Sequence, residues 1–224
     1  MARRRKRREP ETATITAVTH DGRGIAADGG KKAFVAGALE GETVTFVRRK
    51  SHRNFDDAEL LEIHEPSPDR IAAKCEAYGR CGGCALQHVS TARQRAIKEQ
   101  TLRDNLERIG RVEPETWLAP MTGPEWHYRR RARLAVKDVH GKGRALVGFR
   151  ERHAPFITDM HRCEVLAQPV DGLIEPLSEL ISGLSIRARL PQIEVAVAEN
   201  DVALVFRVLD PPTGDDEARF REFG

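Results

Sequence analysis

The chain has 224 residues, of which 40% are hydrophobic and 32% charged, and its formal net charge is +3. This length allows one or two domains, and no stretch approaches the ~20 apolar residues of a transmembrane helix. Six consecutive bases at 3–8 are followed by Glu9-Pro10-Glu11 and not by the apolar core of a secretion signal. The sequence therefore predicts a cytoplasmic protein with no membrane partner, beginning with a disordered basic tail over residues 1–11.

Residues 12–66 are predicted to form a small β-barrel of the oligonucleotide-binding type. Short alternating segments are separated by turn residues such as Asp21-Gly22 and Asp28-Gly29-Gly30. Five strands in about fifty residues fit such a barrel better than an open sheet. A barrel without any ligand remains the alternative. The expected strands are 14–18, 24–27, 32–36, 42–48 and 58–63.

Four cysteines carry the strongest chemical signal. Cys75, Cys81 and Cys84 follow C-x5-C-x2-C spacing within segment 67–90, and Cys163 stands alone downstream. Four thiolates suit an iron–sulfur cube or a closed zinc site, and a cytoplasmic chain disfavours disulfides. The Gly82-Gly83 pair favours a cluster, because glycine lets backbone amides approach a large anion. Zinc remains open, because His88 and His161 stand at plausible ligand spacing.

Residues 91–224 are predicted to form a second, α+β domain that binds RNA. A helix is expected between an N-cap at Ser90 and a stop at Gly110, with an apolar stripe that includes Leu102 and Ile109. The segment 128–136 is expected to be a strand with one arginine-rich face. Planar guanidinium groups bind phosphate well, so these arginines are expected to contact RNA, whereas Arg130 is expected to have a buried partner. The arginines of that face are Arg129, Arg131 and Arg133.

Charge is unevenly distributed over this second half. Between His127 and His153 nine Lys and Arg residues stand against two acids, whereas twelve acids outnumber five bases from Glu164 onward. Such asymmetry is typical of a protein that binds a polyanion through one part of its surface. Phe34 and Phe149 are candidates for stacking on unpaired bases.

The cysteine pattern, its flanking Gln87-His88, the Y-R-R-R-A-R-L text and a fourth cysteine together resemble the bacterial 23S rRNA uracil-C5 methyltransferases that carry an iron–sulfur cluster. The resemblance covers nearly all of residues 12–209. It implies a TRAM barrel, a cluster-bearing central domain and ribosomal RNA as the partner of a monomeric protein. By the same resemblance, the ligands of a [4Fe–4S] cluster would be Cys75, Cys81, Cys84 and Cys163.

The chain departs from this family in its chemistry. Uracil-C5 methylation uses a free cysteine thiolate to attack C6 and a carboxylate base afterwards, yet all four thiols are assigned to the cluster. A glycine-rich unit for S-adenosylmethionine is also missing from the sequence, so the Rossmann-like catalytic domain is expected to be absent and the chain inactive alone. No catalytic residue is therefore assigned. The alternatives are a stand-alone zinc-stabilised RNA-binding module and a small electron-transfer protein.

Overall fold

The computed structural model describes residues 9–27 and 30–224, so the basic run 3–8 and Asp28-Gly29 lie outside the described residues. The chain divides into two compact units. The first comprises residues 1–73 and 85–120, and the second comprises residues 74–84 and 121–224. The segment 67–90 is thus shared between the units. Within the described residues, no helix is long and apolar enough to cross a membrane.

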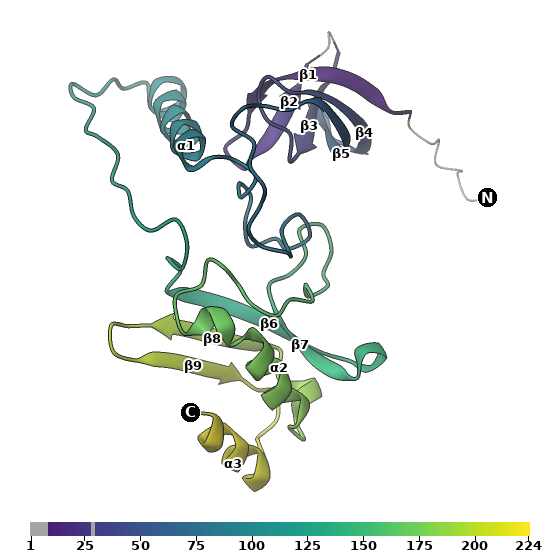
Figure 1. Cartoon of the computed structure of the whole chain (residues 1–224), viewed down its shortest axis with the longest axis vertical. Helices are drawn as coiled ribbons and strands as arrows, with labels where there is room; N and C mark the ends of the chain where they lie inside the picture. Colours follow the sequence, from purple (N-terminus) through teal and green to yellow (C-terminus); the bar gives the residue numbers. More distant parts are fainter. Residues whose placement is uncertain (1–8, 28–29) are drawn as a thin grey trace. The chain divides into compact units, whose positions relative to one another are not determined.

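The first unit contains the five-stranded barrel that the sequence predicts. Its strands close in the order β1-β2-β3-β5-β4, in which β3 and β5 pair parallel and the other neighbours pair antiparallel (Figure 1). The bounds are β1 Glu11–Val18, β2 Arg23–Ala26, β3 Lys32–Ala36, β4 Thr43–Ser51 and β5 Phe55–Glu65.

The barrel core follows the two-residue alternation of the strands. Ile15, Val35, Val44 and Phe46 are at most 2% exposed and form one cluster, and apart from Val47 their sequence neighbours are more exposed. Closure leaves no free strand edge in the barrel, so this small core is sufficient for a defined structure.

A buried carboxylate fixes the chain where it leaves the barrel. Glu42 is fully buried, and its oxygens accept hydrogen bonds from Arg70 Nε and Nη2 at 2.6 and 2.8 Å. The backbone amides of Leu39 and Ser67 complete its shell at 2.7 and 3.1 Å. Burial alone would raise the pKa of Glu42, but these donors hold it below its usual value.

The predicted helix after the cysteine segment is confirmed. Helix α1, Thr91–Asn105, is capped by the Ser90 hydroxyl, which accepts from Arg93 N, and continues as the π-helical turn η1, Leu106–Gly110. The chain reverses at Arg111, whose φ is 51°, one residue later than predicted. The predicted apolar stripe is not buried: Ile97 is the helix's buried residue, whereas Leu102 and Ile109 are 51% and 78% exposed.

The second unit is a four-stranded antiparallel sheet in the order β7-β6-β8-β9. The turn after β6 is the 3-10 segment η2, His140–Lys142, which ends at Gly143 in the left-handed conformation, with a φ of 67°. The strands are β6 Arg131–Val139, β7 Arg144–Gly148, β8 Gln192–Val197 and β9 Val202–Arg207. The helices are η3 Val170–Gly172, α2 Ile174–Ser182, η4 Arg187–Arg189 and α3 Gly214–Phe223.

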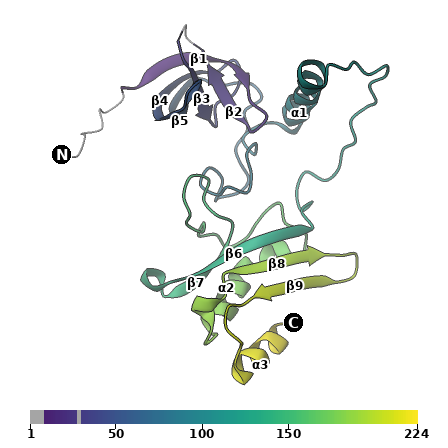
Figure 2. The same ribbon diagram turned by 180° about the vertical axis from the view of Figure 1, so that it is seen from behind.

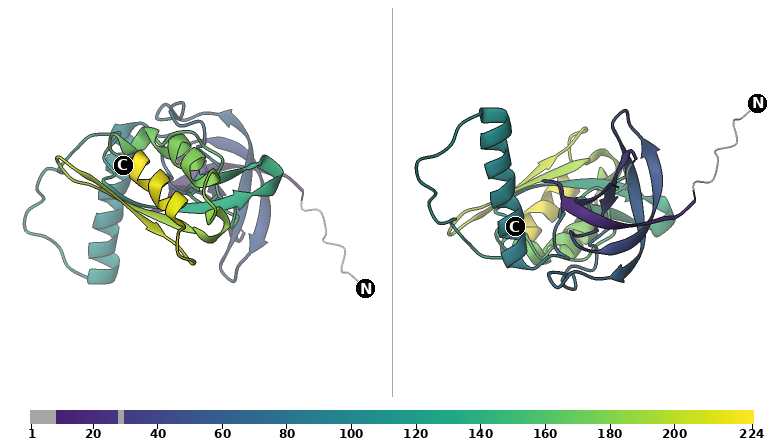
Figure 3. Two further views of the ribbon diagram at one scale, coloured as in Figure 1. Left: turned by 90° about the horizontal axis from the view of Figure 1, so that it is seen from below. Right: turned by 90° about the horizontal axis from the view of Figure 1, so that it is seen from above.

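Both α-helices of this unit lie on one face of the sheet. Leu177 and Ile181 of α2 are fully buried against the sheet residues Leu134 and Ile193, and Phe220 of α3 packs on the same cluster (Figure 3). Figure 2 shows the opposite face, over which no helix lies. The sheet therefore presents one covered, apolar face and one open face.

Replacing Glu42 with Gln tests the buried pair. Because Arg70 loses its charged partner, we expect the barrel to lose about 3 kcal/mol of unfolding free energy, measured by urea denaturation. The pKa of Glu42 is lower in the folded protein than its value of 4.5 in the unfolded chain. The ionised side chain therefore stabilises the fold at pH values above 4.5, and this contribution is lost as the pH falls through the pKa of the folded protein. Wild-type stability should therefore fall more steeply below about pH 5 than that of Glu42→Gln. Parallel pH profiles would contradict this role.

Candidate metal centre and nucleic-acid interface

The second unit brings the four cysteines together. Cys81 and Cys163 are 8% and 5% exposed and belong to one hydrophobic cluster, and Cys75 and Cys84 pack against that cluster. None of them forms a disulfide. The fold thus unites residues that lie about eighty positions apart, as the predicted ligand set requires.

Backbone hydrogen bonds fix the loop that carries Cys81 and Cys84. Cys81 forms an isolated antiparallel bridge with Glu151, in which Gly82 N donates to Arg150 O at 2.9 Å. A Cβ added to Gly82 would lie 3.0 Å from the same carbonyl oxygen, so this position requires glycine for backbone pairing. The amide of Gly83 instead donates to Cys81 Sγ at 3.3 Å. Of the two glycines, Gly83 therefore has the role predicted for an amide beside sulfur.

Cys163 is held by the chain that enters β6. Its amide donates to Asp171 O at 3.0 Å, and its carbonyl accepts from Leu166 N. Arg129 pairs with the same turn, because its amide donates to Val165 O at 2.8 Å and its carbonyl accepts from Ala167 N. The fourth cysteine is therefore positioned by the basic segment itself.

The cysteine environment disfavours ionisation of three of the four thiols. Burial raises the pKa of Cys75, Cys81 and Cys163, and neighbouring thiols raise that of Cys163 further. Thiolates at these positions would need nearby positive charge, and two guanidinium groups supply part of it. Arg152 Nη2 donates to Cys84 O at 2.6 Å, and Arg129 Nη2 donates to Gly83 O at 3.3 Å.

Among the residues that the structure describes, no group of three or more His, Cys, Asp or Glu side chains lies close enough to hold one metal ion. Of the two histidines at plausible zinc spacing, His161 has a side chain that is 60% exposed, with Nδ1 3.0 Å from Glu175 Oε1, and His88 is buried.

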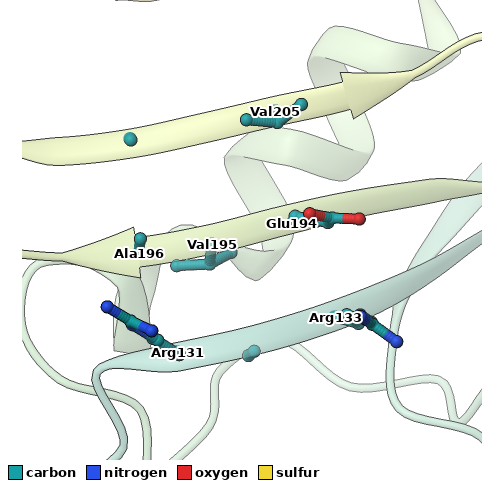
Figure 4. A pocket seen from close by; sticks show the side chains of 8 residues that line it. Arg131, Arg133, Glu194, Val195, Ala196 and Val205 are labelled. Atoms are coloured by element: carbon teal, nitrogen blue, oxygen red, sulfur yellow. The ribbon is translucent and has the colours of Figure 1, made fainter.

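The three predicted RNA-contacting arginines separate into two groups. Arg131 and Arg133 project from β6 on the open face of the sheet (Figure 4). Arg129 precedes the strand, and its guanidinium contacts the cysteine loop and lies 5.5 Å from the centre of the Phe149 ring. Arg130 is exposed, so the predicted buried partner is wrong.

Both predicted stacking residues have ring partners within the chain. Phe149 is covered by Arg129 and packs against the core that holds the cysteines. In the barrel unit the Phe55 ring stacks on Phe34 with the ring centres 4.5 Å apart, and the Arg23 guanidinium lies 4.8 Å from the centre of the Phe34 ring. Local sequence patterns do not single out Arg152, because only the long-range bridge of residue 81 with residue 151 places it beside the cysteines.

Nearly the whole chain is similar to proteins of known name, although no protein-family model matches it. The chain is 50% identical over 216 residues to the 23S rRNA (uracil(1939)-C(5))-methyltransferase of Methylococcus capsulatus, covering 96% of the chain and 49% of that protein. It is 48% identical over 225 residues to the enzyme of the same name from Alkalilimnicola ehrlichii, covering 51% of that protein.

The chain belongs to the RNA uracil-C5 methyltransferase family. It spans about half the length of the curated relatives it matches. The fold is also that of a tRNA (uracil-54, C5)-methyltransferase from Pyrococcus abyssi, solved with S-adenosyl-L-homocysteine. That similarity has a TM-score of 0.67 at 22% identity and covers 93% of this chain and 48% of that one. The family resemblance stated from the sequence is thereby confirmed.

Two neighbouring glycines provide a matched test of the cysteine loop. Gly82→Ala forces the added methyl against a backbone oxygen, so we expect it to lose about 1–3 kcal/mol of unfolding free energy in urea. Gly83→Ala places its methyl 3.4 Å from Cys81 Sγ and the Phe149 ring, an ordinary contact, and should lose less. Equal losses in the two variants would contradict the assigned backbone pairing.

Proposed function

We propose that this chain is the RNA-recognition and cluster-bearing portion of an S-adenosylmethionine-dependent methyltransferase that forms 5-methyluridine in 23S rRNA. The observation that carries the proposal is the convergence of all four cysteines in one core beside an arginine-bearing strand. Relatives with about half their residues identical are named as enzymes acting on 23S rRNA, which supports the substrate. We further propose a cytoplasmic, monomeric protein.

The proposed cofactor is a [4Fe–4S] cluster held by Cys75, Cys81, Cys84 and Cys163. When bound, it would supply coordinate bonds that cross-link the loop at 74–84 to the turn at 163–167. Arg152 and Arg129 would offset part of its negative charge through their contacts with the loop backbone. Its role would be structural, because it would join the cysteine loop to the chain entering β6.

Methyl transfer itself would need a free thiolate in addition to the four cluster ligands. With four cysteines assigned to iron, no further cysteine of the 224 residues can attack uracil C6. We therefore propose that this chain alone neither binds S-adenosylmethionine nor methylates RNA. The domain scheme that follows is a TRAM barrel over 12–66, a cysteine segment over 67–90 and a central RNA-binding domain over 91–224.

Anaerobic reconstitution tests the cluster. We expect brown protein with about four irons and four sulfides per chain, because each cube contains four of each. Cys163→Ser should remove most of this iron. His161→Ala is the control that separates the two metals, since a cluster held by four cysteines keeps its iron while a histidine-containing zinc site loses its metal. Colourless protein with one zinc and no iron would establish the zinc-stabilised module instead.

Salt-dependent binding tests the arginine face. Each phosphate contact that is lost should lower the slope of log affinity against log salt by about 1, so Arg131→Ala/Arg133→Ala should lower it by about 2. The probe is a fragment of 23S rRNA, followed by fluorescence anisotropy. Arg219→Ala/Arg221→Ala, on α3 at the other side of the sheet, should leave the slope unchanged. An unchanged slope in Arg131→Ala/Arg133→Ala would refute the proposed face.

Arg129→Ala should instead lower the iron content of the reconstituted protein, since Arg129 contacts the cysteine loop.

A further inference from the structure

The open face of the sheet is hollowed at its centre. A shallow cavity of about 520 Å³ spans β6, β8 and β9, and Figure 4 shows the side chains around it. Its floor contains small, exposed apolar side chains, namely Ala196, Ala203 and Val205. Ala132 and Val195 border it from the strands while they pack against the opposite, covered face. The size is within the range of pockets that hold one small ligand.

The two arginines of this hollow have different electrostatic surroundings. Arg133 stands directly across the ladder from Glu194, whose pKa it helps to lower. Arg131 stands across from Ala196, and its guanidinium makes no hydrogen bond or ion pair with any residue that the structure describes. Arg131 therefore keeps its guanidinium hydrogen-bond donors and its charge available for an anionic ligand.

Glu194 supplies a fixed acceptor at the edge of the hollow. Its Oε1 accepts from Arg207 Nε and Gln192 Nε2, both at 3.1 Å. The other oxygen, Oε2, accepts no hydrogen bond within the described part of the chain. Hydrogen bonding from Arg207 keeps the pKa of Glu194 below its usual value, so the side chain stays ionised and can only accept. A ligand that reaches Oε2 must present a donor.

We infer that this hollow binds one unpaired nucleotide whose base carries an exocyclic amino group, with its phosphate on Arg131 and its amino group on Glu194. The base would lie on Ala196, Ala203 and Val205, which offer a flat apolar surface between the two polar ends. A carboxylate is a suitable acceptor for the N4 amine of cytosine. Uracil presents the O4 acceptor at the same position and is repelled. The hollow therefore prefers cytidine to uridine and reads a nucleotide other than the base to be methylated.

This inference rests on the proposed RNA-binding function and adds base selectivity to it. The two can be separated, because phosphate contacts weaken binding to all sequences while a base contact changes the ratio between sequences. Cytidine and uridine pentamers differ only at the base edge that would face Glu194. The full chain is titrated with fluorescein-labelled forms of both pentamers at one salt concentration.

We expect the cytidine pentamer to bind about tenfold more tightly than the uridine pentamer, since one good base contact is worth about that factor. Glu194→Gln, whose amide can both donate and accept, should bring the ratio to about one. Glu222→Gln, an exposed carboxylate on α3, is the matched control and should keep the tenfold ratio. Equal binding of the two pentamers by the wild-type chain would overturn the inference.

Filling the hollow gives a second, independent measurement. Ala203→Trp places an indole over the floor from the exposed side of β9, and it should weaken cytidine pentamer binding at least tenfold. Ala218→Trp, at an exposed position of α3, should leave binding unchanged. Unchanged affinity in Ala203→Trp would place the base elsewhere and overturn the inference.

If the 23S fragment still binds with its full salt slope in that case, the proposed function stands without the base-reading hollow. If it does not bind the wild-type chain, the proposed function fails as well.

Discussion

The structure of the second unit depends on the convergence of four cysteines, two of them buried and two half-buried. Cys81 and Cys163 occupy the core that the sheet and α2 share, in places where a protein would otherwise put Val or Leu. Thiolates at the two buried positions are costly without a cation nearby, whereas neutral thiols pack there as small hydrophobes. The backbone pairings of Gly82 with Arg150 and of Arg129 with Val165 hold the thiols in place on both sides.

These pairings also link the cysteines to the arginine-bearing strand. Arg129 uses its backbone to support the turn after Cys163 and its side chain to contact Gly83, while the next two odd-numbered arginines leave the core for the open face. One short run of basic residues therefore serves two purposes. Its start contacts the cysteine loop, and its continuation along β6 places two guanidinium groups on the open face of the sheet.

Much of this architecture could be predicted from the sequence, because short-range patterns determine it. Alternating residues predicted all five barrel strands, and Ser90 predicted the start of α1. The alternation of Arg131 and Arg133 with Leu134 and Val136 predicted which side chains would face outward.

The rest depended on long-range contacts that no local pattern reveals. Arg129 has the same spacing as Arg131 and Arg133, but it lies before the sheet ladder begins, so its side chain turns toward the cysteine loop. Phe34 occurs at an outward position, yet the Phe55 ring from another strand stacks on it and the Arg23 guanidinium lies beside it. Likewise, the pairing of Arg133 with Glu194, about sixty residues away, exists only once β6 and β8 lie together.

The division of the chain into interleaved segments has a mechanical consequence. Residues 74–84 belong to one unit although the chain before and after them belongs to the other, so the polypeptide passes between the units three times. A protease that nicks any single crossing leaves two covalent tethers intact. Separating the two units therefore requires cleavage at all three crossings, whereas a chain with a single interdomain linker needs only one cut.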